Sequence, residues 1–270
     1  MFTATLTTSA NMTSAERVAL FKEIERFIFI CFRLGEFQSS YRSSEYYHKA
    51  KDIYSGEVSV AAVTQEISNN STADATYAIN NFITKIDKKF TYGEGFYGWS
   101  DLRYMLYEYE CSLSVRNNMQ KVDWAMFTKV AKDKISVEHI LPQTPTKWYW
   151  RNQFRQFSAD EIKTLSASLG NLLPLSQSID SGPQNDGFND KKATAASGRR
   201  GYENGSHSEI EVSKEAEWDA YRILQRGIKL LKFMETRWQF QFKNEAQMLD
   251  LLHLRFLLEQ RDIPEEIPPE

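Results

Sequence analysis

Apolar residues recur at helical spacing along most of the chain. From residue 14 to residue 34 they follow intervals of one to three residues, at Val18, Leu20, Phe21, Ile24, Phe27, Ile28, Cys31 and Leu34. Such spacing is typical of a helix that buries one face, and Ser14 ahead of it is a typical helix start. The same pattern predicts helices over residues 43–53, 59–67, 73–86, 100–114, 213–239 and 245–259. A polar stretch at 68–72 predicts a break between two of them.

Two short apolar runs have a different character. Residues 136–139 and 171–174 are too short for helices and are bounded by polar or turn-forming residues, so they predict two strands. Pro142 and the polar residues after it indicate that the first strand ends near His139. Residues 147–157 and 158–168 predict an inserted pair of helices, and the glycine-rich stretch 197–208 predicts an irregular loop. The fold class expected is α+β and mostly α-helical.

Composition is that of an ordinary folded protein. The 270 residues are 41% hydrophobic, 26% charged and 13% aromatic, which favours a packed core over disorder. No apolar run is long enough to span a membrane, and the first twelve residues lack the pattern of a signal peptide. Cys31 and Cys111 have no metal-binding spacing and are expected to be buried free thiols in a reducing compartment. We therefore expect a cytoplasmic protein without membrane contact.

Four polar residues in or just after the two apolar runs suggest chemistry: Glu138, His139, Asn171 and Asp180. A hard divalent ion such as magnesium or manganese prefers oxygen ligands and keeps several waters. Two carboxylates, Glu138 and Asp180, can hold one such ion if a substrate phosphate supplies further oxygens. A neutral imidazole beside it can take a proton from an attacking water, because the pKa of histidine lies near working pH. The set is typical of phosphodiester hydrolysis with one metal ion.

Glu138 and His139 are neighbours, and neighbours on a strand point to opposite faces. Both can serve one site only if the strand ends there and the chain bends. The net charge of −3 argues against a general nucleic-acid binder, which is normally basic. A local positive face can offset that charge, and four basic residues follow the site: Lys191, Lys192, Arg199 and Arg200.

These residues resemble a known nuclease motif. The segment is similar to the HNH, or His-Me finger, motif, in which two strands and a helix surround one metal ion (the ββα-metal motif). It resembles more closely the C-terminal nuclease domain of GmrSD-type restriction endonucleases, which cut modified DNA. The matching positions run from 138 to 143, through Trp148, 170 to 175 and Asp180, to Asn185, Phe188, Lys191 and Lys192. The similarity continues more loosely through residues 102–106, Trp218, Arg226 and Trp238. The family usually has asparagine where this chain has Asp180, and aspartate is at least as good a ligand for a hard cation.

The resemblance implies a role for each residue. His139 would be the general base, and Glu138 and Asp180 would bind one Mg²⁺ or Mn²⁺ ion. Asn171 would brace the loop between the strands and so help to position the catalytic imidazole. Lys191 or Lys192 would contact a substrate phosphate at the finger helix.

Simpler interpretations of the same residues stay open. His139 alone would usually be a half-buried surface histidine, and Glu138 a solvated carboxylate. Asn171 after Gly170 suits a turn residue with positive φ, and Asp180 lies in a good turn sequence. Lys191 and Lys192 suit the solvated face of a helix. Two asparagines are alternative metal ligands or caps of the helix that starts near Asp190, namely Asn185 and Asn189.

The expected function is a metal-dependent DNA endonuclease of a bacterial anti-phage restriction system. We expect a helical region at 1–125, the ββα-metal nuclease motif at 126–210 and C-terminal helices at 211–270. GmrSD-type proteins pair this nuclease with a ParB-like nucleotide hydrolase domain, and nothing in the sequence resembles that domain. Such an NTPase domain or subunit is therefore expected outside this chain. The alternatives are a non-catalytic interaction subunit of a defence complex and an RNase that uses the same site.

Overall fold

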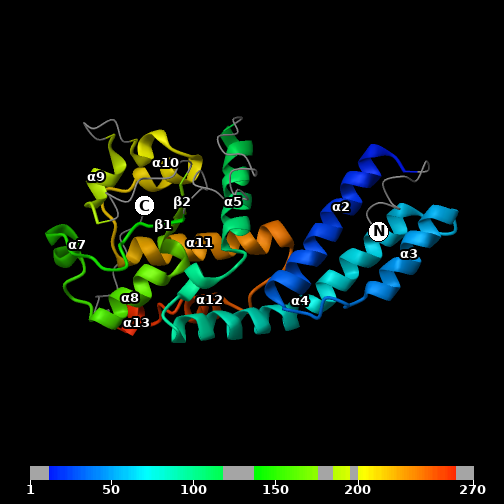
Figure 1. The fold of residues 1–270 in the computed structure, drawn as a ribbon, viewed down its shortest axis with the longest axis horizontal. Helices are drawn as coiled ribbons and strands as arrows, with labels where there is room; N and C mark the ends of the chain where they lie inside the picture. Colours follow the sequence, from blue (N-terminus) through cyan, green and yellow to red (C-terminus); the bar gives the residue numbers. More distant parts are fainter. Residues whose placement is uncertain (1–11, 118–136, 176–184, 195–199, 260–270) are drawn as a thin grey trace, which may run out of the picture. The chain divides into compact units, whose positions relative to one another are not determined.

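The computed structural model describes residues 12–117, 137–175, 185–194 and 200–259. These residues form two compact units. Unit 1 contains the chain up to Lys85 together with Glu235–Phe242, and unit 2 contains Ile86–Met234 and the chain from Lys243 onward. Both units are mainly helical, and one small sheet lies in unit 2 (Figure 1). The α+β, mostly helical class is therefore confirmed, while the three sequence regions expected above stay a prediction.

Unit 1 is built from α2 (Ser14–Ile28), the π-helical turn η1 (Phe29–Leu34), α3 (Ser43–Ser55) and most of α4 (Val60–Thr91). Thr13 caps α2 in a capping box with Glu16. The buried Arg26 guanidinium ties the unit together, because it donates to the carbonyl oxygens of Trp238 at 2.8 Å and Ser68 at 3.2 Å. Trp238 in turn stacks on Phe29, with ring centroids 3.6 Å apart.

The break predicted at residues 68–72 was wrong, because α4 is continuous through it. The Ser71 hydroxyl donates to the carbonyl of Ile67 at 2.9 Å, and the Thr72 hydroxyl donates to that of Ser68 at 3.0 Å. Arg26 also donates to the Thr72 hydroxyl at 3.0 Å. Small polar side chains that would favour a turn in isolation are thus bonded along the helix and to a neighbouring cation.

Unit 2 contains the remaining elements. They are η2 (Gly95–Gly98), α5 (Leu102–Asn117), β1 (Val137–His139), α7 (Trp148–Gln153), α8 (Ala159–Ala167), η3 (Leu169–Asn171), β2 (Leu172–Pro174), α9 (Phe188–Lys192), η4 (Tyr202–Asn204), α10 (His207–Ser213), α12 (Glu245–Leu251) and α13 (Phe256–Glu259). Helix α11 (Ala220–Trp238) contributes its residues up to Met234. None of the helices described is long and apolar enough to cross a membrane.

The two strands pair antiparallel, with Glu138 opposite Leu173 and His139 opposite Leu172. All three residues of β2 are buried, because α5 and α10 pack against this strand. Figure 1 shows β1 and β2 below α10 and to the left of α5. The strands predicted at 136–139 and 171–174 are therefore confirmed to within one residue.

Helix α10 begins inside the stretch that was predicted to be an irregular loop. Ser206 and Glu209 form a capping box at its start. The buried carboxylate of Glu110 on α5 accepts hydrogen bonds from the backbone N–H groups of His207 and Ser208, both at 2.8 Å. An anion at a helix N-terminus satisfies donors that have no partner within the helix. The predicted helix 213–239 also starts later, at Ala220, because Asp219 caps it by accepting from the N–H of Arg222.

Candidate functional site

The first strand ends at the histidine. Beyond His139 the chain leaves the ladder, and the N–H of Ile140 makes a last bond to the carbonyl of Asn171 at 3.0 Å. Ile140 and Leu141 are then fully buried and anchor the bend. The sequence expectation that the strand ends at this point is confirmed.

Asn171 is the brace of this bend. Its buried side-chain oxygen accepts from the N–H of Leu141 at 2.7 Å and from the Trp218 indole at 3.1 Å. Its amide nitrogen donates to the carbonyls of Leu141 and Ser166, both at 2.9 Å. The open alternative of a positive-φ turn was wrong, because Asn171 closes the 3₁₀ turn η3 and is not among the positive-φ residues. Both polar atoms of the amide are occupied, so it acts on His139 through the backbone.

Helix α11 holds the other side of the same bend. The buried Arg226 donates through one nitrogen to the carbonyls of Gly170 at 2.7 Å and Leu172 at 2.8 Å. A Cβ at Gly170 would fall on the carbonyl oxygen of Ile223, so only glycine allows the helix to lie this close.

Glu138 forms a buried ion pair. Its Oε1 lies 2.6 Å from Nζ of Lys191 on α9, and the two side chains are 14% and 2% exposed. Lys191 also donates to the carbonyls of His139 at 3.2 Å and Ile140 at 3.0 Å. An ammonium has three hydrogens, and all three have acceptors here. The phosphate contact expected of Lys191 stays a prediction, and the structure places this lysine as the partner of Glu138.

His139 is half-buried, with its ring 4.6 Å from the ring of Tyr97 in η2. The exposed Gln143 side chain approaches its Nε2 at 3.3 Å. Burial and the nearby Lys191 ammonium lower the pKa of His139 from 6.5 to about 4. The pKa near working pH expected from the sequence is thus shifted down, and the imidazole is neutral at neutral pH.

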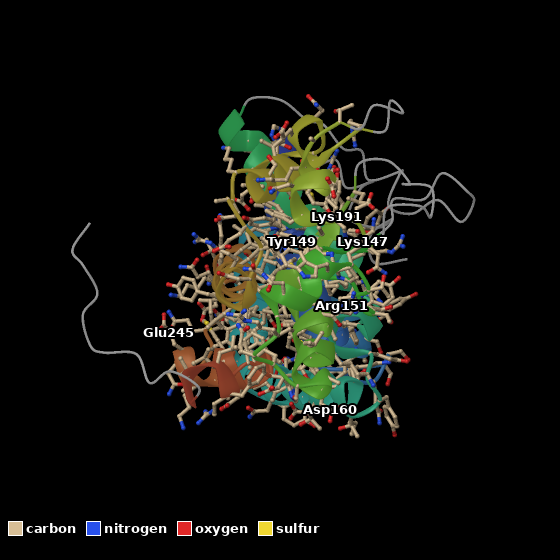
Figure 2. The ribbon with its side chains drawn as sticks, turned by 90° about the vertical axis from the view of Figure 1, so that its left-hand side faces the viewer. Lys147, Tyr149, Arg151, Asp160, Lys191 and Glu245 are labelled. Carbon is tan, nitrogen blue, oxygen red and sulfur yellow. The ribbon has the colours of Figure 1, made fainter. Side chains whose placement is uncertain are left out.

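Helix α9 is fixed to the loop after β1. Asn185 accepts from the N–H of Thr146 at 2.8 Å and donates to the carbonyl of Thr144 at 3.0 Å. The alternative of Asn185 or Asn189 as a helix cap was wrong, because α9 has Gly187 at its N-cap and no side-chain cap bond. The Lys191 ammonium lies 5.9 Å from the ring centroid of the buried Trp150, so α9 and α7 are neighbours (Figure 2).

The other predicted basic residues have partners of their own. Lys192 donates to the carbonyl of Glu215 at 3.0 Å and lies over the Phe188 ring. Arg200 lies 3.6 Å from the carboxylate of Glu209. Arg199 and Asp180 lie outside the described residues, and their predicted roles are untested.

The metal site expected from the sequence is not tested by the described residues. Within the described ranges, no group of three or more His, Cys, Asp or Glu side chains is placed to hold a metal ion. The second carboxylate oxygen of Glu138 makes no hydrogen bond to the described chain, and a hard cation accepts such an oxygen ligand. This oxygen is of the type that a divalent cation binds, and the second expected ligand, Asp180, lies outside the described residues.

Two residues of this region were not found from the sequence. Tyr97 lies in a glycine-bounded turn 42 positions before the histidine, and only the fold brings the rings together. Arg103, in the first turn of α5, has a guanidinium that makes no hydrogen bond or ion pair within the part of the chain described, and its Nη1 is buried. Burial lowers the pKa of Arg103, while the Tyr97 hydroxyl acts in the opposite direction. In the sequence, the feature that could have pointed to Arg103 is its position within residues 102–106, where the family resemblance continues more loosely.

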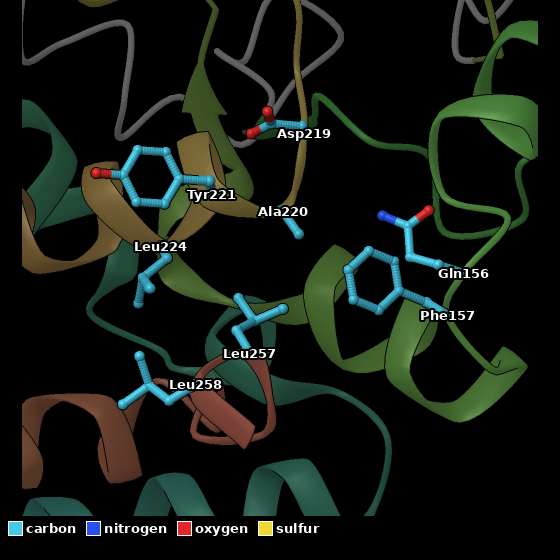
Figure 3. Close-up of a pocket in the computed structure, with 8 residues that line it drawn as sticks. All are labelled: Gln156, Phe157, Asp219, Ala220, Tyr221, Leu224, Leu257 and Leu258. Carbon is cyan, nitrogen blue, oxygen red and sulfur yellow. The ribbon is translucent and has the colours of Figure 1, made fainter. Parts of the chain in front are cut away.

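A pocket of about 250 Å³ in unit 2 lies apart from these residues. Figure 3 shows its mainly apolar wall, to which Phe157, Leu224 and Leu257 belong. None of the predicted site residues lines it. It has no polar cluster suited to the chemistry considered above.

A family model supplies the identification. The model of the GmrSD restriction endonucleases, C-terminal domain, matches residues 78–233, which are more than half of the 270. The chain belongs to this family. Comparisons with curated proteins and with solved structures found no match. Membership in the GmrSD C-terminal domain family confirms the sequence resemblance and indicates a nuclease function related to restriction. The matched range contains β1, β2, α9, Tyr97 and Arg103.

Proposed function

We propose that this chain is a metal-dependent DNA endonuclease in which β1, β2 and α9 form a His-Me finger. The observation that carries the proposal is the neutral His139 at the end of β1, on a bend held by Asn171 and next to Glu138. Two antiparallel strands followed by a helix that contacts the first strand match the order of elements in that motif.

In the proposed mechanism, His139 accepts the proton of the attacking water at its unprotonated ring nitrogen. The exposed Gln143 amide, which approaches that ring, yields its place to the water. Tyr97 packs against the imidazole and limits its rotation. Asn171 holds the backbone from which the ring projects, so it positions the base without touching substrate.

Glu138 would bind a divalent cation through the oxygen that Lys191 does not engage, with Asp180 as the second protein ligand. When bound, such a cation neutralises charge on the phosphate and favours departure of the leaving oxygen. Lys191 fixes the rotamer of Glu138 and partly neutralises it. Arg103, which has no partner in the described chain, would receive the charge of the substrate phosphate.

The direct test is nicking of supercoiled plasmid by the full chain with Mg²⁺, Mn²⁺ or EDTA. We expect cleavage with either ion and none with EDTA. A His139→Ala variant should lose cleavage and keep its unfolding midpoint and its DNA affinity. Gln143→Ala, which alters a neighbour of the ring, is the control and should retain most activity.

Three outcomes would contradict the proposal: wild-type nicking by His139→Ala, cleavage that persists in EDTA, and cleavage of RNA but not of DNA. The last would favour an RNase that uses the same site. We also expect cleavage without nucleotide, because control by NTP hydrolysis would belong to a ParB-like domain or subunit outside this chain. A strict requirement for ATP or GTP would contradict that part alone.

A further inference from the structure

Helix α7 has two faces of opposite character. Trp150 and Phe154, four residues apart, are fully buried. Trp148, Arg151 and Arg155 are three and four residues apart along the chain, and all three are exposed. Residues at these intervals share one side of a helix and the turn that continues it. The helix is thus anchored on one side and presents one aromatic and two cationic groups on the other.

The buried side fixes α7 to the candidate nuclease site. The Trp150 indole donates to the carbonyl of Asp186 at 3.0 Å, just before α9, and its ring lies under the Lys191 ammonium. Gln143, which contacts His139, lies four residues before Lys147, the N-cap of α7. Four residues span at most about 14 Å. The start of α7 therefore lies within a few base pairs' length of His139.

The exposed side is positive, and only one of its three cations has an acidic partner among the described residues. Arg151 and Arg155 form no ion pair with any described residue, while Lys147, at the start of the helix, has a 3.5 Å contact with Asp186. Two further carboxylates engage other residues of this helix: Glu217 accepts from Gln153, and both Glu217 and Asp219 act on Tyr149. Figure 2 shows Lys147 and Arg151 on the face of the unit turned toward the viewer.

Trp148 is the unusual member of this surface. Its side chain is 72% exposed, although tryptophan gains more from burial than most residues. An exposed aromatic ring between cations suits nucleic acid, because phosphates pair with the cations and sugars or unstacked bases contact the ring.

We propose that Lys147, Trp148, Arg151 and Arg155 form a second DNA-contact surface, which holds the duplex beside the cleavage site. Lys191, Lys192 and Arg200 are bound to other groups of the chain. The surface on α7 supplies positive charge for the DNA phosphates in their place. The inference rests on the proposed nuclease function and specifies how its substrate is held.

The experiment measures binding of a fluorescent duplex, about three helical turns long, by the full chain carrying His139→Ala, over a range of salt concentrations with Mg²⁺ present. Arg151→Ala/Arg155→Ala should lower the slope of log affinity against log salt by about 2, because each phosphate contact contributes about 0.9. Trp148→Ala should weaken binding, because an apolar contact with the sugars is lost, and should leave the slope unchanged, because no charge is removed.

Matched controls come from the same unit. Lys163→Ala/Lys214→Ala removes two exposed charges from other segments, and Tyr92→Ala removes another highly exposed aromatic ring. Both should bind DNA as the parent does. Equal slopes for the arginine variant and the lysine control would overturn the inference, as would unchanged affinity of Trp148→Ala or preferential binding of RNA.

The two proposals fail in distinguishable ways. If wild-type protein nicks plasmid and the α7 variants bind DNA normally, the proposed DNA-contact surface is wrong and the proposed nuclease function is supported. If wild-type protein neither nicks nor binds DNA, both are wrong. If the α7 variants weaken binding but wild-type protein never nicks DNA, the surface stands and the chain acts as a DNA-binding subunit.

Discussion

The ammonium of Lys191 lies 2.6 Å from the carboxylate of Glu138, and both side chains are largely buried. A lysine that follows the candidate site would ordinarily be assigned to the substrate phosphate. Here it serves the carboxylate that is the candidate metal ligand. The pair links α9 to β1 and, through the carbonyls of His139 and Ile140, to the bend after the strand.

Breaking this pair should destabilise the protein. Lys191→Met leaves a largely buried carboxylate and two carbonyls without their donor, and removing one member of a buried pair costs about 3 kcal/mol or more. Urea unfolding of the variant should therefore give a clearly lower free energy of unfolding. Lys192→Met is the control, because it removes one bond to a backbone carbonyl and should cost about 1 kcal/mol. An equal loss in both variants would contradict the central role of Lys191.

Asn171 should be required for stability as well as for catalysis. Asn171→Ala removes four hydrogen bonds and leaves the Trp218 indole and both polar groups of Leu141 unsatisfied. Each buried unsatisfied group costs about 1–3 kcal/mol, so the total loss should exceed about 3 kcal/mol.

Asn185→Ala is the matched control for Asn171. It removes two bonds to a more exposed loop and should cost about 1 kcal/mol. The two variants are compared by chemical unfolding. Near-wild-type stability of Asn171→Ala would contradict the conclusion that its hydrogen bonds hold the bend after β1.

These examples show how far the sequence leads. The strands, the end of β1 and the bracing role of Asn171 followed from short apolar runs, Pro142 and the resemblance. Local patterns carry such features because strand ends and turns depend on neighbouring residues. The burial of Lys191 was not predictable, since in sequence a lysine suits a solvated helix face. Only packing of α9 on β1 and α7 reveals that it has almost no access to solvent.

Long-range contacts account for the errors as well. The polar stretch in α4 stays helical because Arg26, more than 40 residues away, binds Ser68 and Thr72. The start of α10 is stabilised by Glu110 from α5, nearly 100 residues earlier. Neither partner can be identified from local composition.

Arg103 offers a test of substrate contact. Its guanidinium has no partner in the described chain, so Arg103→Ala should leave the free energy of unfolding within about 0.5 kcal/mol of wild type. If the side chain pairs with a phosphate, kcat/KM for DNA should fall by about 10- to 100-fold, the equivalent of one charge-assisted bond. Arg103→Lys should recover part of the loss.

The control for Arg103 is Lys163→Ala, an exposed cation elsewhere in unit 2. Cleavage rates are measured under subsaturating DNA, and stability is measured by urea unfolding. Arg103→Ala with wild-type kcat/KM would show that this cation does not meet the substrate.

Gly170, in η3 just before β2, lies directly against the backbone of α11. A Cβ there would overlap the carbonyl oxygen of Ile223 and approach the backbone nitrogen of Gly227 at 2.7 Å, and both are backbone atoms of a helix that cannot shift alone. Gly170→Ala must therefore separate α11 from the bend, which stretches the bonds of Arg226 to Gly170 and Leu172. We expect a loss of about 3 kcal/mol or more, since overpacking combines here with lost buried hydrogen bonds.

Gly187→Ala is the matched control. A Cβ at Gly187 would meet nothing closer than a side-chain oxygen of Asp190 at 3.3 Å, and φ is −60°, so this variant should be nearly neutral. Thermal unfolding of the two alanine variants side by side decides the matter, because equal melting temperatures would mean that α11 does not lie against this glycine.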